Sequence, residues 1–580
     1  MSSLRRSSSR TDTLIIAASR VASISAVVLL IGMLPWLSGN RPEYTILRAR
    51  YADLEVTEEN LAAVREQLGL DRGPWGVFAD WLGGLAHGNA GQSWISGRPV
   101  LPGIINALGV SVTLMGCAMM VACVATAAIA VPPMVRGLRG RPSRGSGLLA
   151  VAFTALPEFL LAAVLLVIGA VWLGWFPPYG WKSLHYAVLP ALALGIPAGG
   201  LIGRLISDSI TAVFSEKWVL TWQMAGATTV RLAGAVFRRA LTPVLPQVGL
   251  VLIGLTGGAV TVEQVFAIPG LGRTTLGAAS SQDIPTLQAG VLALVLLAVI
   301  VGALTGLARR ILLGPALHQD SMPVQIEQRH LRRRDLVVPV VIAVVLALII
   351  ITGLLRDPFT SAHGRLEGPS PALPFGADAS GRDLLARVGH GAVTTLGSAV
   401  VVVLICLVLG LVLGCFPRLP VGVFEITNAA PPIIAGLIVA AIAGPSTGGA
   451  ALAVAAVSWA PLAAHTGSLV TEARAQPHIA MLPVLGVGRA RILLVHVLPT
   501  VIPPVARHAA LRLPGIALAL AALGFLGLGP HPPTPEWGLI LSEGIDYVER
   551  APWAVLAPAT ALVLSSMLAV SLSALPPRRR

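Results

Sequence analysis

Long apolar blocks are the feature of this sequence that most constrains its fold. Each block holds about 20 residues or more, enough to cross the roughly 30 Å hydrocarbon core of a bilayer as a helix. The backbone of an open sheet cannot be satisfied in lipid, and the blocks lack the alternation of barrel strands. The sequence therefore predicts an all-α polytopic membrane protein. We place its twelve spans at 14–37, 104–134, 147–175, 185–206, 244–263, 286–312, 336–355, 392–416, 421–443, 449–470, 502–528 and 553–575.

Composition and charge agree with this class. The 580 residues are 55% hydrophobic and only 12% charged, against about 25% charged in soluble proteins. The net charge of +14 comes from arginines in short loops between blocks, a pattern typical of cytoplasmic loops. It indicates membrane topology and lipid contact rather than a nucleic-acid partner. Four cysteines lie in apolar blocks without metal-ligand spacing, so we predict no metal site.

Arginine placement also predicts the orientation of the chain. Arginine-rich stretches at 5–10, 136–144, 309–334 and 578–580 fall on one side of the membrane if there are twelve spans. Both termini are then cytoplasmic, and the long loop 38–103 is extracytoplasmic. The first block, 14–37, has no clear small-x-small cleavage site, so we predict a retained helix rather than a cleaved signal.

The chain divides into two related halves. A Pro-containing stretch with a basic end, 314–335, is predicted to be a cytoplasmic linker, although contact with a lipid surface is an alternative. It separates a first half, 1–313, from a second, 336–580. The halves repeat weakly: Ser111-Val112-Thr113-Leu114 opens the second block and Thr394-Thr395-Leu396 opens the eighth. Such parallel repeats place a transport path at the interface of the halves.

Two cytoplasmic segments, 215–246 and 471–504, share one layout. In each, a short predicted helix ends at a glycine that allows a tight turn, and a basic amphipathic helix then leads to proline before the next span. One alternative is that each segment is an ordinary interfacial loop. The occurrence of the same layout in both halves instead favours two compact projections, or knobs, that bind a partner protein. Proline 483 should shorten or kink its helix. The candidate coupling residues are Trp222, Ala225, Gly226, Arg231, Pro243, Met481, Pro483, Gly486, Arg489, His496 and Pro499.

Further motifs follow the long blocks. The first half carries Glu-x-x-Phe-x-x-Pro-Gly-Leu-Gly, and the second carries a Gly-Ala-Asp-x-x-Gly-Arg-Asp element and Phe-Leu-Gly-Leu-Gly. With these residues the chain resembles the inner-membrane permeases of dipeptide/oligopeptide/nickel ABC importers, with two different permease subunits fused in one chain. The motif residues are Glu263, Phe266, Pro269, Gly270, Gly272 and Asp283 in the first half, and Gly376, Asp378, Gly381, Arg382, Asp383, Phe525, Gly527, Gly529, Trp537 and Gly538 in the second.

The resemblance implies a type I importer fold of two six-helix halves. It also implies a path for peptides, nickel, metal chelates or similar small solutes, and an extracytoplasmic solute-binding lipoprotein that delivers them. The two knobs would be coupling loops that dock on two ABC ATPase subunits, which bind ATP and Mg²⁺. The loops here depart from the family pattern, since neither has an alanine-rich core after an acidic residue. This departure predicts either docking partners that are divergent as well or weak coupling.

Other function classes fit the sequence less well. A phosphate-binding loop needs Gly-x-x-x-x-Gly-Lys-Ser/Thr, and the glycine cluster 444–449 lacks the lysine. We therefore predict that the chain is not an enzyme and binds no cofactor of its own. An ion-gradient-driven secondary transporter is the main alternative, but it would need charged relays within the spans, and few are present. A membrane-bound enzyme would need an acidic or histidine cluster at one face, and an exporter usually carries a fused ATPase domain.

Ionisable residues within spans often mark a transport path. Glu158 follows Pro157 in a long apolar block, and we predict that it faces the pore; a nearer span boundary or an internal hydrogen bond are the alternatives. Asp208 and Glu425 lie near predicted cytoplasmic ends, where solvation is the simpler interpretation. His465 is interpreted as a hydrogen-bonded histidine within the helix bundle.

Overall fold

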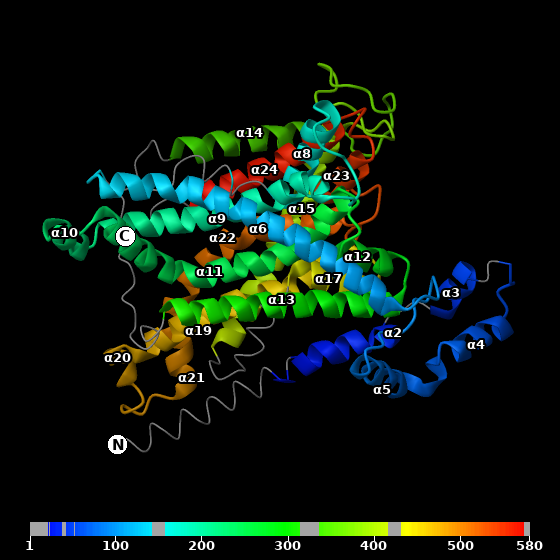
Figure 1. Cartoon of the computed structure of the whole chain (residues 1–580), viewed down its shortest axis with the longest axis horizontal. Helices are drawn as coiled ribbons and strands as arrows, with labels where there is room; N and C mark the ends of the chain where they lie inside the picture. Colours follow the sequence, from blue (N-terminus) through cyan, green and yellow to red (C-terminus); the bar gives the residue numbers. More distant parts are fainter. Residues whose placement is uncertain are drawn as a thin grey trace. The chain divides into compact units, whose positions relative to one another are not determined.

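The computed structural model describes residues 21–37 except 23, 42–50, 53–141, 153, 157–313, 336–415 and 431–573. This part of the chain is almost wholly helical (Figure 1), with only isolated β-bridges between extended residues. The prediction of an all-α polytopic membrane protein is confirmed. Among the described residues, eight helices are long and apolar enough to span a membrane, and three shorter apolar helices accompany them.

The helices fall into two series along the chain. Helices up to residue 313 are α2 (Leu34–Leu37), α3 (Pro42–Arg50), α4 (Glu58–Gln67), η1 (Leu70–Arg72), α5 (Gly73–Ala86), α6 (Val100–Leu138), α8 (Glu158–Leu165), η2 (Leu166–Trp172), η3 (Leu184–Ala187), α9 (Val188–Phe214), α10 (Lys217–Met224), α11 (Thr229–Val265), α12 (Leu271–Ser280) and α13 (Ile284–Leu313). The later ones are α14 (Val337–Leu354), α15 (Leu384–Gly414), α17 (Pro432–Ala443), α18 (Thr447–Ser458), α19 (Ala460–Ala475), α20 (Pro477–Ala480), α21 (Arg489–Arg491), η6 (Ile492–Val497), α22 (Leu498–Phe525), α23 (Trp537–Ile545) and α24 (Trp553–Ser573).

The eleven apolar helices correspond to predicted spans two to twelve, and the first predicted span is described only from residue 21. Contacts group the chain into two compact units. One comprises 1–105, 274–295 and 392–539, and the other comprises 106–273, 296–391 and 540–580. Each unit contains residues of both predicted halves. The division at 314–335 stays a prediction, because that linker lies outside the described residues.

Two predicted boundaries are wrong in an informative way. Helix α11 is continuous from Thr229 to Val265 through Pro243, and a second continuous helical run extends from Arg489 to Phe525 through Pro499. We expected separate amphipathic helices that end at these prolines. In membrane helices the carbonyls freed by proline find other partners. Pro243 offers no N–H to Arg239 O, and the neighbouring Thr242 hydroxyl donates to Arg238 O at 3.0 Å. The π-helical segment η6 ends at Val497, two residues before Pro499.

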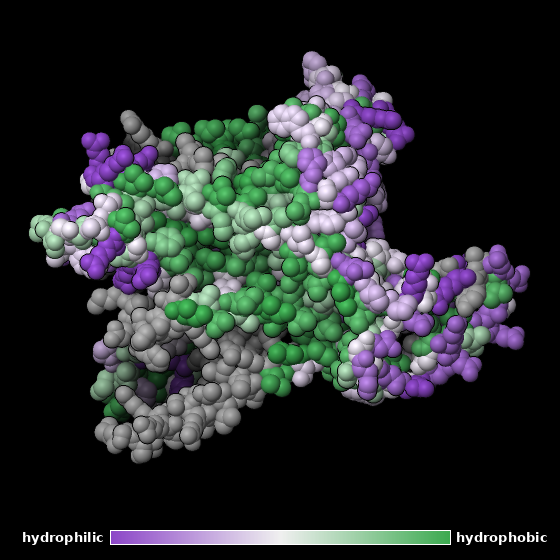
Figure 2. All heavy atoms as spheres, in the orientation of Figure 1, coloured by the Kyte–Doolittle hydropathy of each residue, from purple (hydrophilic) through white to green (hydrophobic). Residues whose placement is uncertain are grey.

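The surface of the long helices suits lipid. Figure 2 shows hydrophobic residues along α13 and α14 and hydrophilic residues over α3 and α4. In α14 only 22% of the most apolar window is buried within the protein. Apolar side chains that point away from the bundle are expected where the solvent is hydrocarbon.

Close helix packing within the second of these units depends on a small-residue stripe. Gly195, Gly199 and Gly203 recur every fourth residue on one face of α9 and lie against α6. A Cβ atom on Gly199 would come within 2.5 Å of Ala122 O. Such stripes let membrane helices approach closely and gain dispersion contacts that lipid cannot replace.

We expect Gly199→Ala to destabilise the protein by about 1–3 kcal/mol, since an added methyl overpacks the helix contact. The measurement is the thermal unfolding midpoint of the purified chain in mild detergent. Gly116→Ala on α6 is the matched control, because no atom lies within 4 Å of its added Cβ. Equal midpoints for the two variants would contradict the close approach of α6 and α9.

Candidate coupling loops and buried carboxylate sites

The first candidate coupling loop is the turn between α9 and α11. Its helix α10 occupies Lys217–Met224 and ends at Ala225. Gly226 then adopts a φ of +75°, in the left-handed region that favours glycine. The chain is extended at Thr228, where α11 begins. The sequence thus forms the short helix and glycine turn that the pattern predicted.

Specific contacts hold this loop to its flanking helices. The Trp218 indole N–H donates to Glu216 Oε2 at 2.6 Å, and Arg239 of α11 lies 3.4 Å from Glu216 Oε1. Val219 is buried in an apolar cluster with Val236 and other residues of α9 and α11. The ring of Trp218 also packs edge-on against Trp222. These contacts fix the position of the loop relative to α9 and α11.

The second loop repeats this backbone 260 residues further along. Gly486 has a φ of +80°, and Gly488 is extended with the same dihedrals as Thr228. The helical run 489–525 then matches α11, 229–265, residue for residue in length. Helix α20 ends at Ala480, whereas the matched α10 reaches Met224. The predicted shortening before Pro483 is confirmed.

Both loop tips expose apolar side chains. Met224 is 78% exposed and Val484, at the matched position, is 77% exposed. Trp222, Leu220, Met481 and Leu485 are also exposed in these loops. Apolar side chains gathered at a polar membrane face favour a protein partner.

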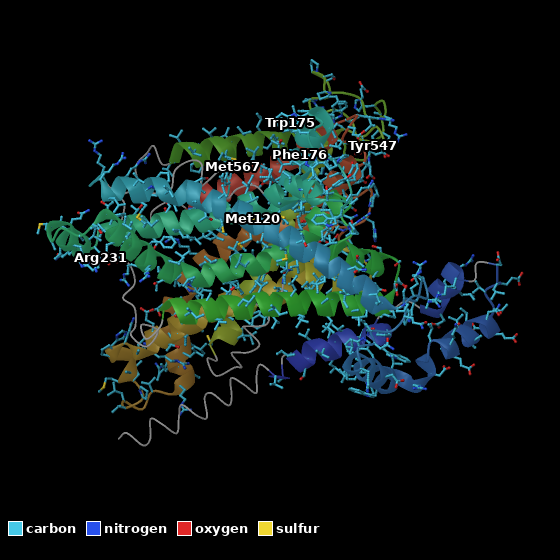
Figure 3. The ribbon with its side chains drawn as sticks, in the orientation of Figure 1. Met120, Trp175, Phe176, Arg231, Tyr547 and Met567 are labelled. Atoms are coloured by element: carbon cyan, nitrogen blue, oxygen red, sulfur yellow. The ribbon has the colours of Figure 1, made fainter. Side chains whose placement is uncertain are left out.

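Some of the remaining candidate coupling residues lie at the loop tips, and others lie further along the following helices. Ala225 and the basic residues Arg231 and Arg489 are exposed at or just after the two glycine turns, and Figure 3 labels Arg231 near α10. Pro243 lies about 20 Å along α11 from its start, at 1.5 Å per residue. His496 and Pro499 likewise lie beyond the second turn, on the helical run toward the membrane. These three are not brought to the loop tips.

A buried carboxylate caps helix α12 at the far end of α11. Glu263 is fully buried and accepts a hydrogen bond from the Ser111 hydroxyl of α6. The first N–H of α12, at Leu271, donates to Ser111 Oγ at 2.8 Å, and the third, at Arg273, donates to Glu263 Oε2 at 3.0 Å. A Cβ on Gly270 would overlap the carboxylate. This geometry explains why the motif joins a glutamate to a downstream glycine.

The second half contains the same arrangement at α23. The Thr395 hydroxyl of α15 donates to Glu536 Oε1 at 3.0 Å, and the first helical N–H, at Trp537, donates to Thr395 Oγ1 at 3.2 Å. The third N–H, at Leu539, donates to Glu536 Oε2 at 2.8 Å. Gly524 leaves the space that this carboxylate occupies. Each site is a hydroxyl–carboxylate cap on the amides of one helix.

The two caps are equivalent by position as well as by chemistry. Ser111 and Thr395 are each the twelfth residue of their helix. The glutamates differ, because Glu263 lies in the last turn of the preceding long helix, whereas Glu536 directly precedes α23. Sequence reasoning found Glu263 and Trp537 but missed Glu536. The paired hydroxyl positions at the starts of the second and eighth blocks were the available signal.

The Gly-Ala-Asp-x-x-Gly-Arg-Asp element forms a buried ion-pair network. Asp378 accepts hydrogen bonds from Arg382 Nε and Arg387 Nη1, each at 2.7 Å. Arg387 is fully buried and also donates to Glu543 at 2.6 Å. Asp383 pairs with Arg356 at 2.8 Å. Several partners for each charge offset the desolvation that burial demands. The motif residues are thus brought together with Arg387, which continues the element in the sequence, and with Glu543, which the sequence did not single out.

The other motif residues mainly shape the backbone. Asp283 accepts from the Ser93 hydroxyl and from Trp94 N at 2.8 Å, which ties the segment before α6 to the start of α13. Phe266 and Phe525 are buried, and Pro269 is exposed. Gly376, Gly381 and Gly527 have positive φ values, while Gly272, Gly529 and Gly538 lie against neighbouring backbone.

Glu158 lies at the first residue of α8, directly after Pro157. Its carboxyl group lies near Leu194 of α9 and Gly258 of α11, where an added Cβ would be 3.4 Å from the carboxyl carbon. The pore role of Glu158 stays a prediction.

Two further carboxylates are predicted to lie near the cytoplasmic ends of spans. Asp208 is half exposed beside Arg204, and Glu425 lies outside the described residues. Within the described residues, no group of three His, Cys, Asp or Glu could hold a metal ion.

Comparison with known proteins identifies the family to which this fold and these motifs belong. Residues 124–313 and 406–580 each match the model of the binding-protein-dependent transport system inner membrane component. The di/tripeptide transport system permease protein DppC of Pseudomonas aeruginosa is 35% identical over 225 residues, which cover 37% of this chain and 74% of that protein. The glutathione transport system permease protein GsiC of Salmonella choleraesuis is 34% identical over 240 residues, covering 41% and 78%.

The helical fold and the two matches define a membrane permease. The chain belongs to the family of binding-protein-dependent transport system inner membrane components and contains its domain twice. It is a transmembrane permease component of an ABC importer, as the resemblance implied. A third relative, a putative peptide transport system permease protein of Brucella suis, is 30% identical over 283 residues, covering 46% of this chain and 87% of that protein.

We expect Ser111→Ala and Thr395→Ala each to destabilise the chain by about 1–3 kcal/mol, because a buried carboxylate and a helix N–H both lose a partner. The measurement is the unfolding midpoint in detergent. Thr113→Ala is the control, since its hydroxyl bonds only Gly109 O of the same helix. If Ser111→Ala and Thr113→Ala behaved alike, the cap would not stabilise the fold.

The Glu536 cap predicts a pH dependence of stability. Burial raises the pKa of Glu536 to about 7 from 4.5, against the opposing effect of its hydrogen bonds. The folded chain then holds a proton that the unfolded chain releases, so stability is highest below pH 4.5 and falls as pH rises to about 7. The full effect is about 3 kcal/mol.

Unfolding midpoints between pH 4.5 and 8 measure this effect. Glu536→Gln should flatten the decline in that window, because its amide cannot ionise. Glu549→Gln, at an exposed position of the same loop region, should leave it unchanged. A decline that persisted in Glu536→Gln would assign the pH dependence to other groups.

Proposed function

We propose that this chain forms the whole translocation path of an ABC importer for peptides or similar small solutes. Six spans from each half would line the path in the cell membrane, with both termini cytoplasmic. The two copies of the family domain support this proposal. The relatives also support it, because they are named as permeases for di/tripeptide, glutathione and peptide transport. None of the relatives named here is a nickel permease, so peptides are the favoured solute.

The matched loops carry the proposal. We infer that each loop docks on one of two ABC ATPase subunits, which bind ATP and Mg²⁺. The supporting observation is the pair of exposed apolar tips, Met224 and Val484, at equivalent positions 260 residues apart. An extracytoplasmic solute-binding lipoprotein would deliver the solute at the opposite face.

The geometry supplies a way to transmit force. Helix α11 is continuous from the first loop to Glu263, and 37 residues give a rod of about 55 Å. The run 489–525 is equally long and ends beside Gly524, which contacts the second cap. When ATP closes the ATPase subunits, each loop would push its rod. Rigid-body rocking of the helices would then open the path to one side at a time.

Met224→Asp and Val484→Asp should uncouple transport, because a carboxylate would replace the apolar contact with the ATPase. The experiment purifies the tagged chain with its ATPase subunits and measures bound ATPase and peptide uptake in proteoliposomes. We expect the double variant to lose at least tenfold in both, which corresponds to about 1.4 kcal/mol or more of binding.

Phe359→Asp is the control, since this exposed residue lies in the predicted extracytoplasmic segment and should leave bound ATPase unchanged. Full ATPase binding by the double variant would refute docking at these tips. Uptake that survives ATP depletion but fails without an ion gradient would refute the importer and favour a secondary transporter.

A further inference from the structure

A cluster of one arginine and two histidines lies within the membrane helices of the second half and has no role in the sites above. His508 and Arg512 are four residues apart on α22, and His465 comes from α19. The rings of His465 and His508 lie 4.8 Å apart at an interplanar angle of 35°. Arg512 is close enough to His508 and to Cys406 of α15 to interact electrostatically.

The cluster lies on the inner face of α22. Val501, Val505 and Ala509 are buried and mark the packed face of this helix. By helical periodicity His508 and Arg512 lie on that same face. Both are partly buried, whereas Arg507 is exposed. The guanidinium of Arg512 therefore points into the bundle and not into lipid.

The described surroundings supply no counter-charge. Arg512 forms no ion pair with any described residue, and its guanidinium stays protonated at any physiological pH. Helices α17, α18 and α19 pack against α22. Their only carboxylate is Glu472, which is exposed and two turns beyond His465. A charge at this depth is costly unless it faces an aqueous path or an anion.

The repeat shows that the fold does not require these three polar side chains. With the 260-residue offset set by the two loops, His465, His508 and Arg512 correspond to Leu205, Val248 and Leu252 in the first half. The first half forms the matching helices with three apolar residues. The cluster is thus an addition to one half and not part of the shared architecture.

We propose that Arg512, flanked by His465 and His508, binds the α-carboxylate of a peptide as it passes through the second half. The proposal rests on the proposed peptide function and narrows it to solutes with a free carboxylate. A guanidinium presents two parallel N–H donors that match a carboxylate, and such charge-assisted pairs are strong in a desolvated site. The two imidazoles add donors beside it.

The test compares trialanine with trialanine amide in proteoliposomes that contain the chain, its ATPase subunits and the binding protein. Maximal rates are measured at saturating loaded binding protein, so the affinity of that protein for each probe does not enter. The wild type should transport the free acid faster. Arg512→Gln should slow the free acid about tenfold or more, the effect of one lost charged hydrogen bond, and leave the amide unchanged.

Two further variants make the test specific. Arg507→Gln removes the same charge from the exposed side of α22 and should change neither rate. Arg512→Lys keeps the charge without the paired donors and should retain part of the free-acid rate. Equal slowing of both probes in Arg512→Gln would assign the residue a structural role, and equal wild-type rates would also overturn the proposal. A wild-type complex that transports neither probe would instead refute the peptide function itself.

Discussion

Hydrocarbon offers no partner to a backbone N–H or C=O group, and this constraint governs the protein. Long helices satisfy it along their length, even through Pro243 and Pro499. At helix starts the chain needs side chains, and the pairs Ser111–Glu263 and Thr395–Glu536 accept the leading amides of α12 and α23. Each cap also joins segments distant in sequence, so one interaction both ends a helix and fixes its neighbours.

In each half, the cap and the loop lie at opposite ends of one long helical segment, α11 in the first half and 489–525 in the second. The loop before α11 is braced by Glu216, and the cap at its other end is closed by Glu263. Neither end is free to bend independently of the helix. The second half repeats this plan from Gly486 to Gly524, which gives the permease two long helical elements, each with a glycine turn at one end and a carboxylate cap at the other.

Local sequence predicted much of this architecture. Apolar blocks located eleven described helices, and glycines 226 and 486 located both turns. The rule that proline ends a helix failed at Pro243, because the helical hydrogen bonds on both sides of it continue from Thr229 to Val265. Glu536 escaped notice because its partner Thr395 lies 141 residues away in sequence. His508 and Arg512 of α22 became significant only when the repeat register placed Val248 and Leu252 at the matching positions.

The unequal loops have a consequence for assembly. Helix α10 presents two turns at its tip, whereas α20 presents one turn before Pro483. If the loops dock on two ATPase subunits as proposed, their different shapes would distinguish the two positions, even though the backbone around them is shared. Two different ATPase subunits would then each bind only one of the loops. The single polypeptide would thus determine which subunit lies beneath which half of the permease.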